Sequence, residues 1–172
     1  MKLSTRARYA LRMMLDVARH AETGKPVSLA AISERIGVSR GYLEQLALSL
    51  RNARLIRSAS GRHGGYQLAL PASEIPIRDI IEATIGPICI VECVDDPEIC
   101  KRSHDCECRL LYALINERIA EVLRAYTVSD LLDPEWAQTV RERLPDLPIP
   151  VAHPSDADAA HRSPEGRNHG AG

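Results

Sequence analysis

Residues 28–56, SLAAISERIGVSRGYLEQLALSLRNARLI, predict two helices joined by a tight turn. Ser28 is expected to cap the first helix, and Gly37 to end it, because glycine tolerates the left-handed conformation that often follows a helix. Ser39 is expected to cap a second, longer helix. The apolar residues at helical spacing are Leu29, Ile32 and Ile36 in the first helix, and Leu43, Leu46, Ala47 and Leu50 in the second. This arrangement is typical of a helix-turn-helix, although a helical hairpin in any bundle would give the same pattern.

A glycine-rich segment directly after these helices separates the two interpretations. Residues 55–70, LIRSASGRHGGYQLAL, hold two short β-prone runs on either side of the stretch 61–65. Its glycines permit the positive φ values that a tight hairpin tip requires. A hairpin in this place is the wing of a winged helix-turn-helix, and a plain exposed turn is the less favoured reading. Arg62 at the tip could enter a minor groove, where a narrow groove strengthens the negative potential.

The candidate DNA-binding residues lie on the second helix and on the wing. The predicted contacts are Ser39, Arg40, Gly41, Tyr42, Glu44 and Gln45 on the helix, and Arg62 and His63 on the wing. Residues 1–70 carry 12 basic and 4 acidic residues, a net charge of +8, whereas residues 71–172 carry 10 and 19, a net charge of −9. A basic half favours a polyanionic partner, although an unevenly charged solvated surface would look the same.

Further helices are predicted on both sides of this region. Ser4 is expected to cap a helix over residues 5–21, with Ala10, Met13, Met14 and Val17 on its apolar face. A short helix is expected over 76–84, a long one over 108–126, and a last short one after Ser129. The long helix carries Leu111, Leu114, Ile115, Ile119, Val122, Leu123 and Tyr126 at helical spacing, and the last carries Leu131, Leu132 and Trp136. One small domain cannot cover the long apolar stripe, so we expect it to pack in a dimer.

The predicted fold class is therefore mainly α with a small β-wing. We expect four parts: a winged helix-turn-helix domain over 1–84, a cysteine-bearing segment over 85–108, a dimerisation helix with a short final helix over 109–144, and a disordered tail over 145–172. The tail is rich in proline and poor in apolar residues. No apolar run approaches the roughly 20 residues of a membrane span, and the first residues lack a signal-peptide pattern. A cytoplasmic protein without a membrane partner is expected.

All five cysteines fall between Cys89 and Cys108, in what we call the cysteine loop, residues 86–108. In a reducing cytoplasm such clustering favours metal or redox chemistry over structural disulfides. The wide spacing of Cys93, Cys100 and Cys106 suits an iron–sulfur cluster, whose ligands must wrap around an inorganic core. Zinc, which more often uses closely paired cysteines, and redox-active or incidental thiols remain as alternatives.

With these residues in view, the sequence resembles the IscR/NsrR/RirA family of iron–sulfur winged-helix regulators. The matching stretches are MKLSTRARYALRMMLDVA, LAAISERIGVSRGYLEQL, GRHGGYQLALPASEI and the three-cysteine loop. The resemblance implies a homodimer joined by the long helix, bound to a pseudo-palindromic duplex and acting as a repressor. It also implies a cluster, 2Fe–2S or 4Fe–4S, held by Cys93, Cys100 and Cys106.

The chain departs from that pattern at several positions. Some members supply a ligand from the first helix, where this chain has Arg8 and Arg12, and others use a histidine where it has Arg109. These arginines cannot bind iron, so Cys108, Cys89, His104 or an external group is expected as the fourth ligand. Ser60 replaces an arginine that opens the wing in many members.

Two other functions compete with the cluster-sensing regulator. One is a winged-helix regulator with structural zinc or with thiols that form a disulfide. The other is a small redox or iron–sulfur carrier enzyme. The sequence shows neither a nucleophile–histidine–carboxylate motif nor a phosphate-binding loop, so we expect no enzyme.

Overall fold

The computed structural model describes residues 3–20, 24–61 and 64–144. The chain forms two compact units, Met1–Gln138 and Thr139–Gly172. Within the described ranges, no helix is long and apolar enough to cross a membrane. Arg62, His63 and the predicted tail over 145–172 lie outside the described residues.

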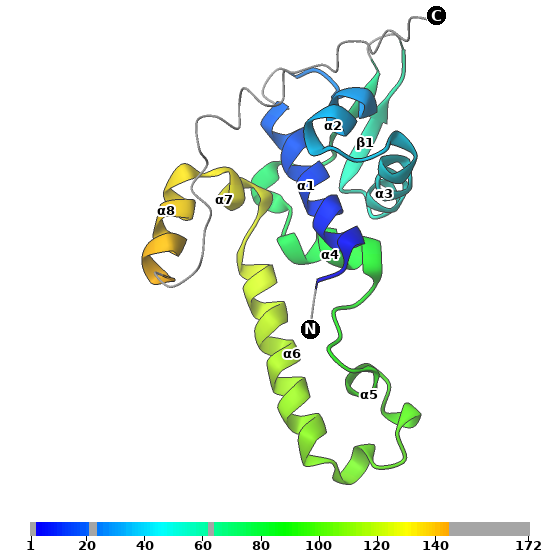
Figure 1. Ribbon diagram of the computed structural model, residues 1–172, viewed down its shortest axis with the longest axis vertical. Helices are drawn as coiled ribbons and strands as arrows, with labels where there is room; N and C mark the ends of the chain where they lie inside the picture. The colour runs from blue at the N-terminus through cyan, green and yellow to red at the C-terminus, as the bar shows by residue number, and fades with distance from the viewer. Residues whose placement is uncertain (1–2, 21–23, 62–63, 145–172) are drawn as a thin grey trace, which may run out of the picture. The chain divides into compact units, whose positions relative to one another are not determined.

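Helix α1 (Thr5–His20) is the centre of the first unit. It begins as predicted, because the Ser4 hydroxyl accepts a hydrogen bond from the Ala7 backbone N–H at 3.1 Å. Its apolar face is fully buried, and α1 packs against α2, α3, α4, α7 and β2 (Figure 1). The buried face includes all four predicted core residues: Ala10, Met13, Met14 and Val17.

The predicted helix-turn-helix is present as α2 (Leu29–Ile36) and α3 (Arg40–Asn52). Ser28 caps α2 by accepting the N–H of Ala31, and Ser39 caps α3 by accepting the N–H of Tyr42. Gly37 ends α2 with φ of 73°, the left-handed conformation expected there. The predicted apolar face of α3 is buried at Leu43, Leu46, Ala47 and Leu50.

The wing is a hairpin of β1 (Ile56–Ala59) and β2 (Gly65–Leu68), paired antiparallel with Ile56 opposite Leu68. Gly61 has the predicted positive φ, at 110°. Gly65 does not, and its small size serves a different purpose: a Cβ there would clash with the carbonyl oxygen of Val27. This close approach lets Tyr66 and Val27 exchange two backbone hydrogen bonds, which tie the wing to the segment before α2.

Beyond the wing, a 3₁₀ turn η2 (Ala72–Glu74) leads to α4 (Ile77–Ile85), close to the predicted 76–84. The long helix α6 (Glu107–Ala125) also matches its prediction within one residue at each end. The cysteine loop between them is more ordered than its sequence indicates. It contains the short helix α5 (Glu92–Asp95) and the 3₁₀ turns η3 (Pro97–Ile99) and η4 (Ser103–Asp105).

The C-terminal helices differ in number and in their first cap from the prediction. The single short helix expected after Ser129 is two helices, α7 (Val128–Leu132) and α8 (Pro134–Arg143). Thr127 is the real cap of α7, in a reciprocal capping box with Asp130. The hydrogen bonds from the Thr127 backbone and side chain lower the pKa of the Asp130 carboxyl. Pro134, which lacks an N–H, starts α8 rather than continuing α7.

One ion pair fixes α2 against α1. Both guanidinium nitrogens Nε and Nη2 of Arg35 donate to the Asp16 carboxylate at 2.7 Å. The Asp16 side chain is 10% exposed and that of Arg35 is 37% exposed. The hydrogen bond to Asp16 raises the pKa of the Arg35 guanidinium. The pair therefore orients the first helix of the helix-turn-helix.

We expect Arg35→Ala to destabilise the protein by about 2–4 kcal/mol, because it leaves the buried Asp16 carboxylate without its partner. Asp16→Ala should cost less, about 1–3 kcal/mol, since the partly exposed arginine can turn to water. Urea unfolding of the two single variants and the double variant measures the coupling. Costs that simply add would show that the pair contributes no interaction energy.

Candidate functional site: a DNA-binding helix and a cysteine loop

The predicted DNA-binding residues of α3 divide into two groups. Arg40, Gly41, Glu44 and Gln45 lie exposed along one face. Ser39 and Tyr42 also have structural roles: the exposed Ser39 caps α3, and the half-buried Tyr42 packs edge-on against Tyr9 with ring centroids 6.0 Å apart. The open face of α3 is therefore formed by its exposed polar residues.

Three exposed arginines outside the predicted set extend the open face of α3 and make it basic. Arg51 lies in the last turn of α3, Arg54 in the turn that follows, and Arg57 on β1. All three are exposed. Their positions connect the open face of α3 with the hairpin, where a phosphate backbone could lie. The net charge of residues 1–70 was the only sign of them in the sequence.

Arg8 and Arg12 are also positioned by the structure. Their guanidinium carbons lie 5.2 Å and 5.4 Å from the ring centroid of Tyr9. These distances are within the range of cation–π contacts. Since Tyr9 packs on Tyr42, the two arginines lie beside the start of α3.

The cysteine loop holds five free thiols. Cys93, Cys100 and Cys106 are half-buried, and Cys89 and Cys108 are exposed. Cys89 donates its S–H to the carbonyl of Val91 at 2.9 Å. Among the described residues, no three histidine, cysteine or acidic side chains are gathered closely enough to hold a metal ion. The thiols share one segment without forming a ready ligand set.

Three hydrogen bonds shape this loop. Arg109, in the first turn of α6, donates from Nε to the carbonyl of Cys93 at 2.7 Å. The buried Ser103 hydroxyl donates to the carbonyl of Pro97 at 2.7 Å. The backbone N–H of Ile88 donates to the Glu82 carboxylate at 3.5 Å. The start of the loop is thus attached to α4, and its backbone at Cys93 is attached to the first turn of α6.

The donor chemistry of this loop suits an iron–sulfur cluster, because thiolates are its usual protein ligands. Cys93, Cys100 and Cys106, the three cysteines that the resemblance assigns as ligands, are half-buried. His104 is exposed and lines a polar pocket of about 400 Å³ with Asp105, Cys106 and Glu107, among others. Since the three thiols are not gathered, binding would require the loop to rearrange.

Helix α6 exposes the apolar stripe that the sequence predicted. Leu114 is 55% exposed and Val122 is 57% exposed. The stripe begins with Leu110 and Leu111, and an open groove runs along it, lined by Leu114, Ile115, Arg118, Ile119, Val122 and Leu123. Two residues of the predicted stripe differ from its others: Leu123, at the edge of the groove, and Tyr126 pack on the core of the same chain, as the buried Ala120 side of α6 faces inward. One chain alone leaves much of the stripe uncovered.

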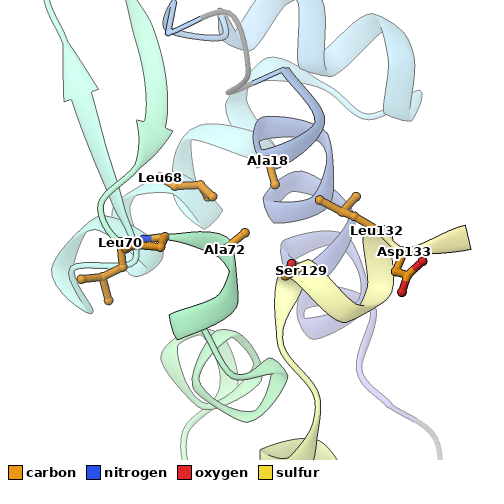
Figure 2. Close-up of a pocket in the computed structure, with 8 residues that line it drawn as sticks. Ala18, Leu68, Leu70, Ala72, Ser129, Leu132 and Asp133 are labelled. Atoms are coloured by element: carbon orange, nitrogen blue, oxygen red, sulfur yellow. The ribbon is translucent and has the colours of Figure 1, made fainter. Parts of the chain in front are cut away.

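A further cavity lies away from the exposed face of α3 and from the cysteine loop. It has a volume of about 590 Å³ and is lined by side chains of α1, the wing and α7, including Ala18, Leu68 and Leu132 (Figure 2). Its one carboxylate, Asp133, already accepts the N–H of Glu135 at 2.9 Å. The cavity contains none of the predicted site residues.

Comparisons with known proteins agree with this geometry. Residues 3–134 match the Rrf2 family, described as iron-dependent transcriptional regulators. The chain is 40% identical to the protein rrf2 of Nitratidesulfovibrio vulgaris, over 77% of this chain and 87% of that protein. It is 39% identical to the transcriptional regulator IscR of Aliivibrio salmonicida, over 83% of this chain and 84% of that protein. The solved structure of CymR, the global cysteine regulator of B. subtilis, is similar with a TM-score of 0.62 and 39% identity, covering 76% of this chain and 95% of that one.

These relatives confirm the predicted regulator and contradict the enzyme alternative. The match spans the winged helix-turn-helix, the cysteine loop and α6 together. The chain therefore belongs to the Rrf2 family of helix-turn-helix transcription regulators.

Proposed function

We propose that the chain is a cytoplasmic, homodimeric repressor whose DNA affinity is controlled by an iron–sulfur cluster bound to Cys93, Cys100 and Cys106. The observation that carries this proposal is the concentration of all five thiols between Cys89 and Cys108, four in the segment that joins α4 to α6 and the fifth in the first turn of α6. Because α4 packs on α1 and α3, the shape of this segment can act on the DNA-binding helix. The IscR name of the relatives supports a cluster over other metals.

Dimerisation through α6 would place two copies of α3 side by side. The 19 residues of α6 span about 28 Å at a rise of 1.5 Å per residue, which is long enough for an extended apolar contact. Two recognition helices related by a two-fold axis read half-sites about 34 Å apart. A pseudo-palindromic operator follows from this symmetry.

The chain's own residues define how binding could alter the loop. Cys93, Cys100 and Cys106 would hold the cluster, and Cys108, Cys89 or His104 would complete the ligand set. An iron–sulfur cluster supplies a group that is gained, lost or oxidised with iron supply, redox state or nitric oxide. Convergence of the three thiols would move the backbone near Cys93, whose carbonyl accepts from Arg109, and could also act on the bond between Ile88 and Glu82. Cluster binding can change the affinity for DNA only to the extent that the cluster binds the two loop shapes with different affinity.

The first test is a 300–700 nm spectrum of the anaerobically purified protein, with iron and sulfide content. We expect visible absorption, stoichiometric iron and sulfide, and different operator affinities for cluster-loaded and cluster-free protein. Zinc without sulfide, or equal affinities in both states, would contradict the proposal.

A thiol switch or a structural zinc site is the second candidate function. The absence of a gathered ligand set among the described residues favours thiols that act as such, and Cys89 and Cys108 are exposed to oxidants. The similarity to CymR, of which an oxidised form from Staphylococcus aureus has been solved, points the same way. Treatment with peroxide, followed by mass spectrometry of the thiols and a DNA-binding measurement, distinguishes this function from cluster control.

The DNA interface makes its own prediction. Operator binding should weaken steeply with salt, with a log–log slope of about −0.9 for each phosphate neutralised. Gln45→Ala should reduce discrimination against non-operator DNA by about 1–3 kcal/mol and leave non-specific affinity nearly unchanged. Fluorescence anisotropy with both duplexes at several salt concentrations measures this.

Arg57→Gln is the matched control for Gln45, because an exposed arginine on the wing is expected to contact phosphate. It should weaken binding to both duplexes alike and make the salt slope less steep by about one. Arg62→Ala should weaken binding through the loss of a wing contact. If Gln45→Ala weakened both duplexes equally, Gln45 would not be a base-reading residue.

A further inference from the structure

Arg6, in the first turn of α1, connects two elements that are distant in sequence. Its Nε donates to the carbonyl oxygen of Thr84 in α4 at 2.8 Å, and its Nη2 donates to the Ser49 hydroxyl in α3 at 2.9 Å. The guanidinium is planar and rigid, so one group fixes the distance between both acceptors. Arg6 is half-buried, which limits competition from water.

The α4 end of this connection lies next to the cysteine loop. Thr84 is buried, and its carbonyl is among the last four of α4, which have no partner within the helix. The positive charge of Arg6 also interacts favourably with the dipole at the C-terminus of α4. Two residues later, Gly86 turns the chain into the loop with φ of 83° and ψ of −172°. This region of backbone space is essentially restricted to glycine, so the turn is sharply defined.

The α3 end of the connection lies next to the candidate base-reading residue. The Ser49 hydroxyl that accepts from Arg6 also donates to the Gln45 carbonyl, at a longer 3.4 Å. Gln45 is one helical turn earlier, on the exposed face of α3. A displacement of Ser49 therefore acts on the part of α3 that faces DNA.

We infer that Arg6 is a positioning residue that couples the shape of the cysteine loop to the DNA affinity of α3, through Thr84 on one side and Ser49 on the other. This inference rests on the proposed control of DNA binding by the loop. If Arg6 only stabilised the fold, its replacement would change DNA affinity by the same factor whatever the state of the loop.

The first arm of the test uses cluster-free protein and perturbs the loop by Gly86→Ala. Operator affinity is measured for wild type, Gly86→Ala, Arg6→Gln and the double variant, on a duplex that the wild type selects from a random pool. Gly86→Ala should change the dissociation constant about fivefold or more when Arg6 is present, and less than about twofold in Arg6→Gln. If Gly86→Ala changes the dissociation constant by the same factor with and without Arg6, the inference is overturned.

Two further variants keep this arm decisive. Arg19→Gln removes the same charge from the last turn of α1 and should leave the Gly86→Ala effect intact. If Gly86→Ala does not fold, Glu82→Ala replaces it, because Glu82 binds both Arg78 and the Ile88 N–H. Ser49→Ala should reproduce the loss of coupling, and Arg6→Gln combined with Ser49→Ala should add little more.

The second arm compares cluster-loaded with cluster-free protein, and the loaded forms of wild type and Arg6→Gln carry the same iron and sulfide content. Arg6→Gln should bring the ratio of the two dissociation constants at least about fivefold closer to one while retaining the cluster's visible spectrum. An unchanged ratio in Arg6→Gln would overturn the role of Arg6. A ratio of one in wild type would overturn the proposed cluster control instead, and the Gly86 cycle would still decide whether Arg6 couples loop and helix.

Discussion

Leu114→Glu is expected to convert the protein to a monomer and to weaken operator binding about 100-fold or more, because a monomer loses the avidity of two half-sites. Leu114 is 55% exposed on α6, within the apolar groove that also includes Ile115 and Val122. In a dimer joined there, a glutamate would be buried without a partner, which costs several kcal/mol. Light scattering gives the mass, and anisotropy gives the affinity.

The exposure of Leu114 makes the variant informative about assembly rather than folding. In a single chain the new carboxylate would face water, so the helical content of the Leu114→Glu variant should match that of wild type by circular dichroism. Arg124→Gln is the matched control, since it makes the same change of −1 in net charge at an exposed position of α6 that does not line the groove. It should remain dimeric. A dimer of unchanged mass and affinity in Leu114→Glu would place the interface elsewhere.

The sequence predicted the helix-turn-helix well because its signals are local. Ser28, Gly37 and Ser39 each act on backbone groups within a few residues, and the structure has all three in the predicted roles. The apolar periodicity of α1 and α3 likewise needed no knowledge of the partner surface. Local chemistry misled only where two similar signals compete, as at Ser129 and Thr127, where the reciprocal bond with Asp130 selects the earlier cap.

The contacts that connect the two halves of the candidate site could not be predicted. Arg6 lies 78 residues from Thr84 and 43 from Ser49 in the sequence, and no periodicity marks such a pair. The same holds for Arg109. The family pattern suggested a missing ligand at this position, whereas the structure gives it a bond to the Cys93 carbonyl. Residues that cannot bind a metal can still determine the shape of the loop that would.

Alanine substitution of Cys93, Cys100 or Cys106 is expected to abolish the cluster or to weaken its retention more than tenfold. Changes to residues beyond the direct ligands already weaken metal binding about 10–100-fold, so the loss of a ligand should cost at least as much. Each variant would leave two of the three thiolates assigned by the resemblance. All three side chains are half-buried, which shields a bound cluster from solvent better than an exposed thiol would. Iron, sulfide and the visible spectrum are measured after anaerobic reconstitution.

Cys89→Ala and Cys108→Ala are the matched controls, because they remove exposed thiols from the same loop. Each should retain iron and sulfide, and the one that supplies a fourth ligand should show a shorter cluster lifetime or an altered spectrum. Since the Cys89 thiol is engaged with the Val91 carbonyl, Cys108 and His104 are the more accessible partners. Full iron and sulfide in Cys93→Ala, together with their loss in Cys89→Ala, would show that the ligand assignment is wrong. Equal retention in all five variants would remove the cysteines as ligands and leave the thiol switch as the function to test.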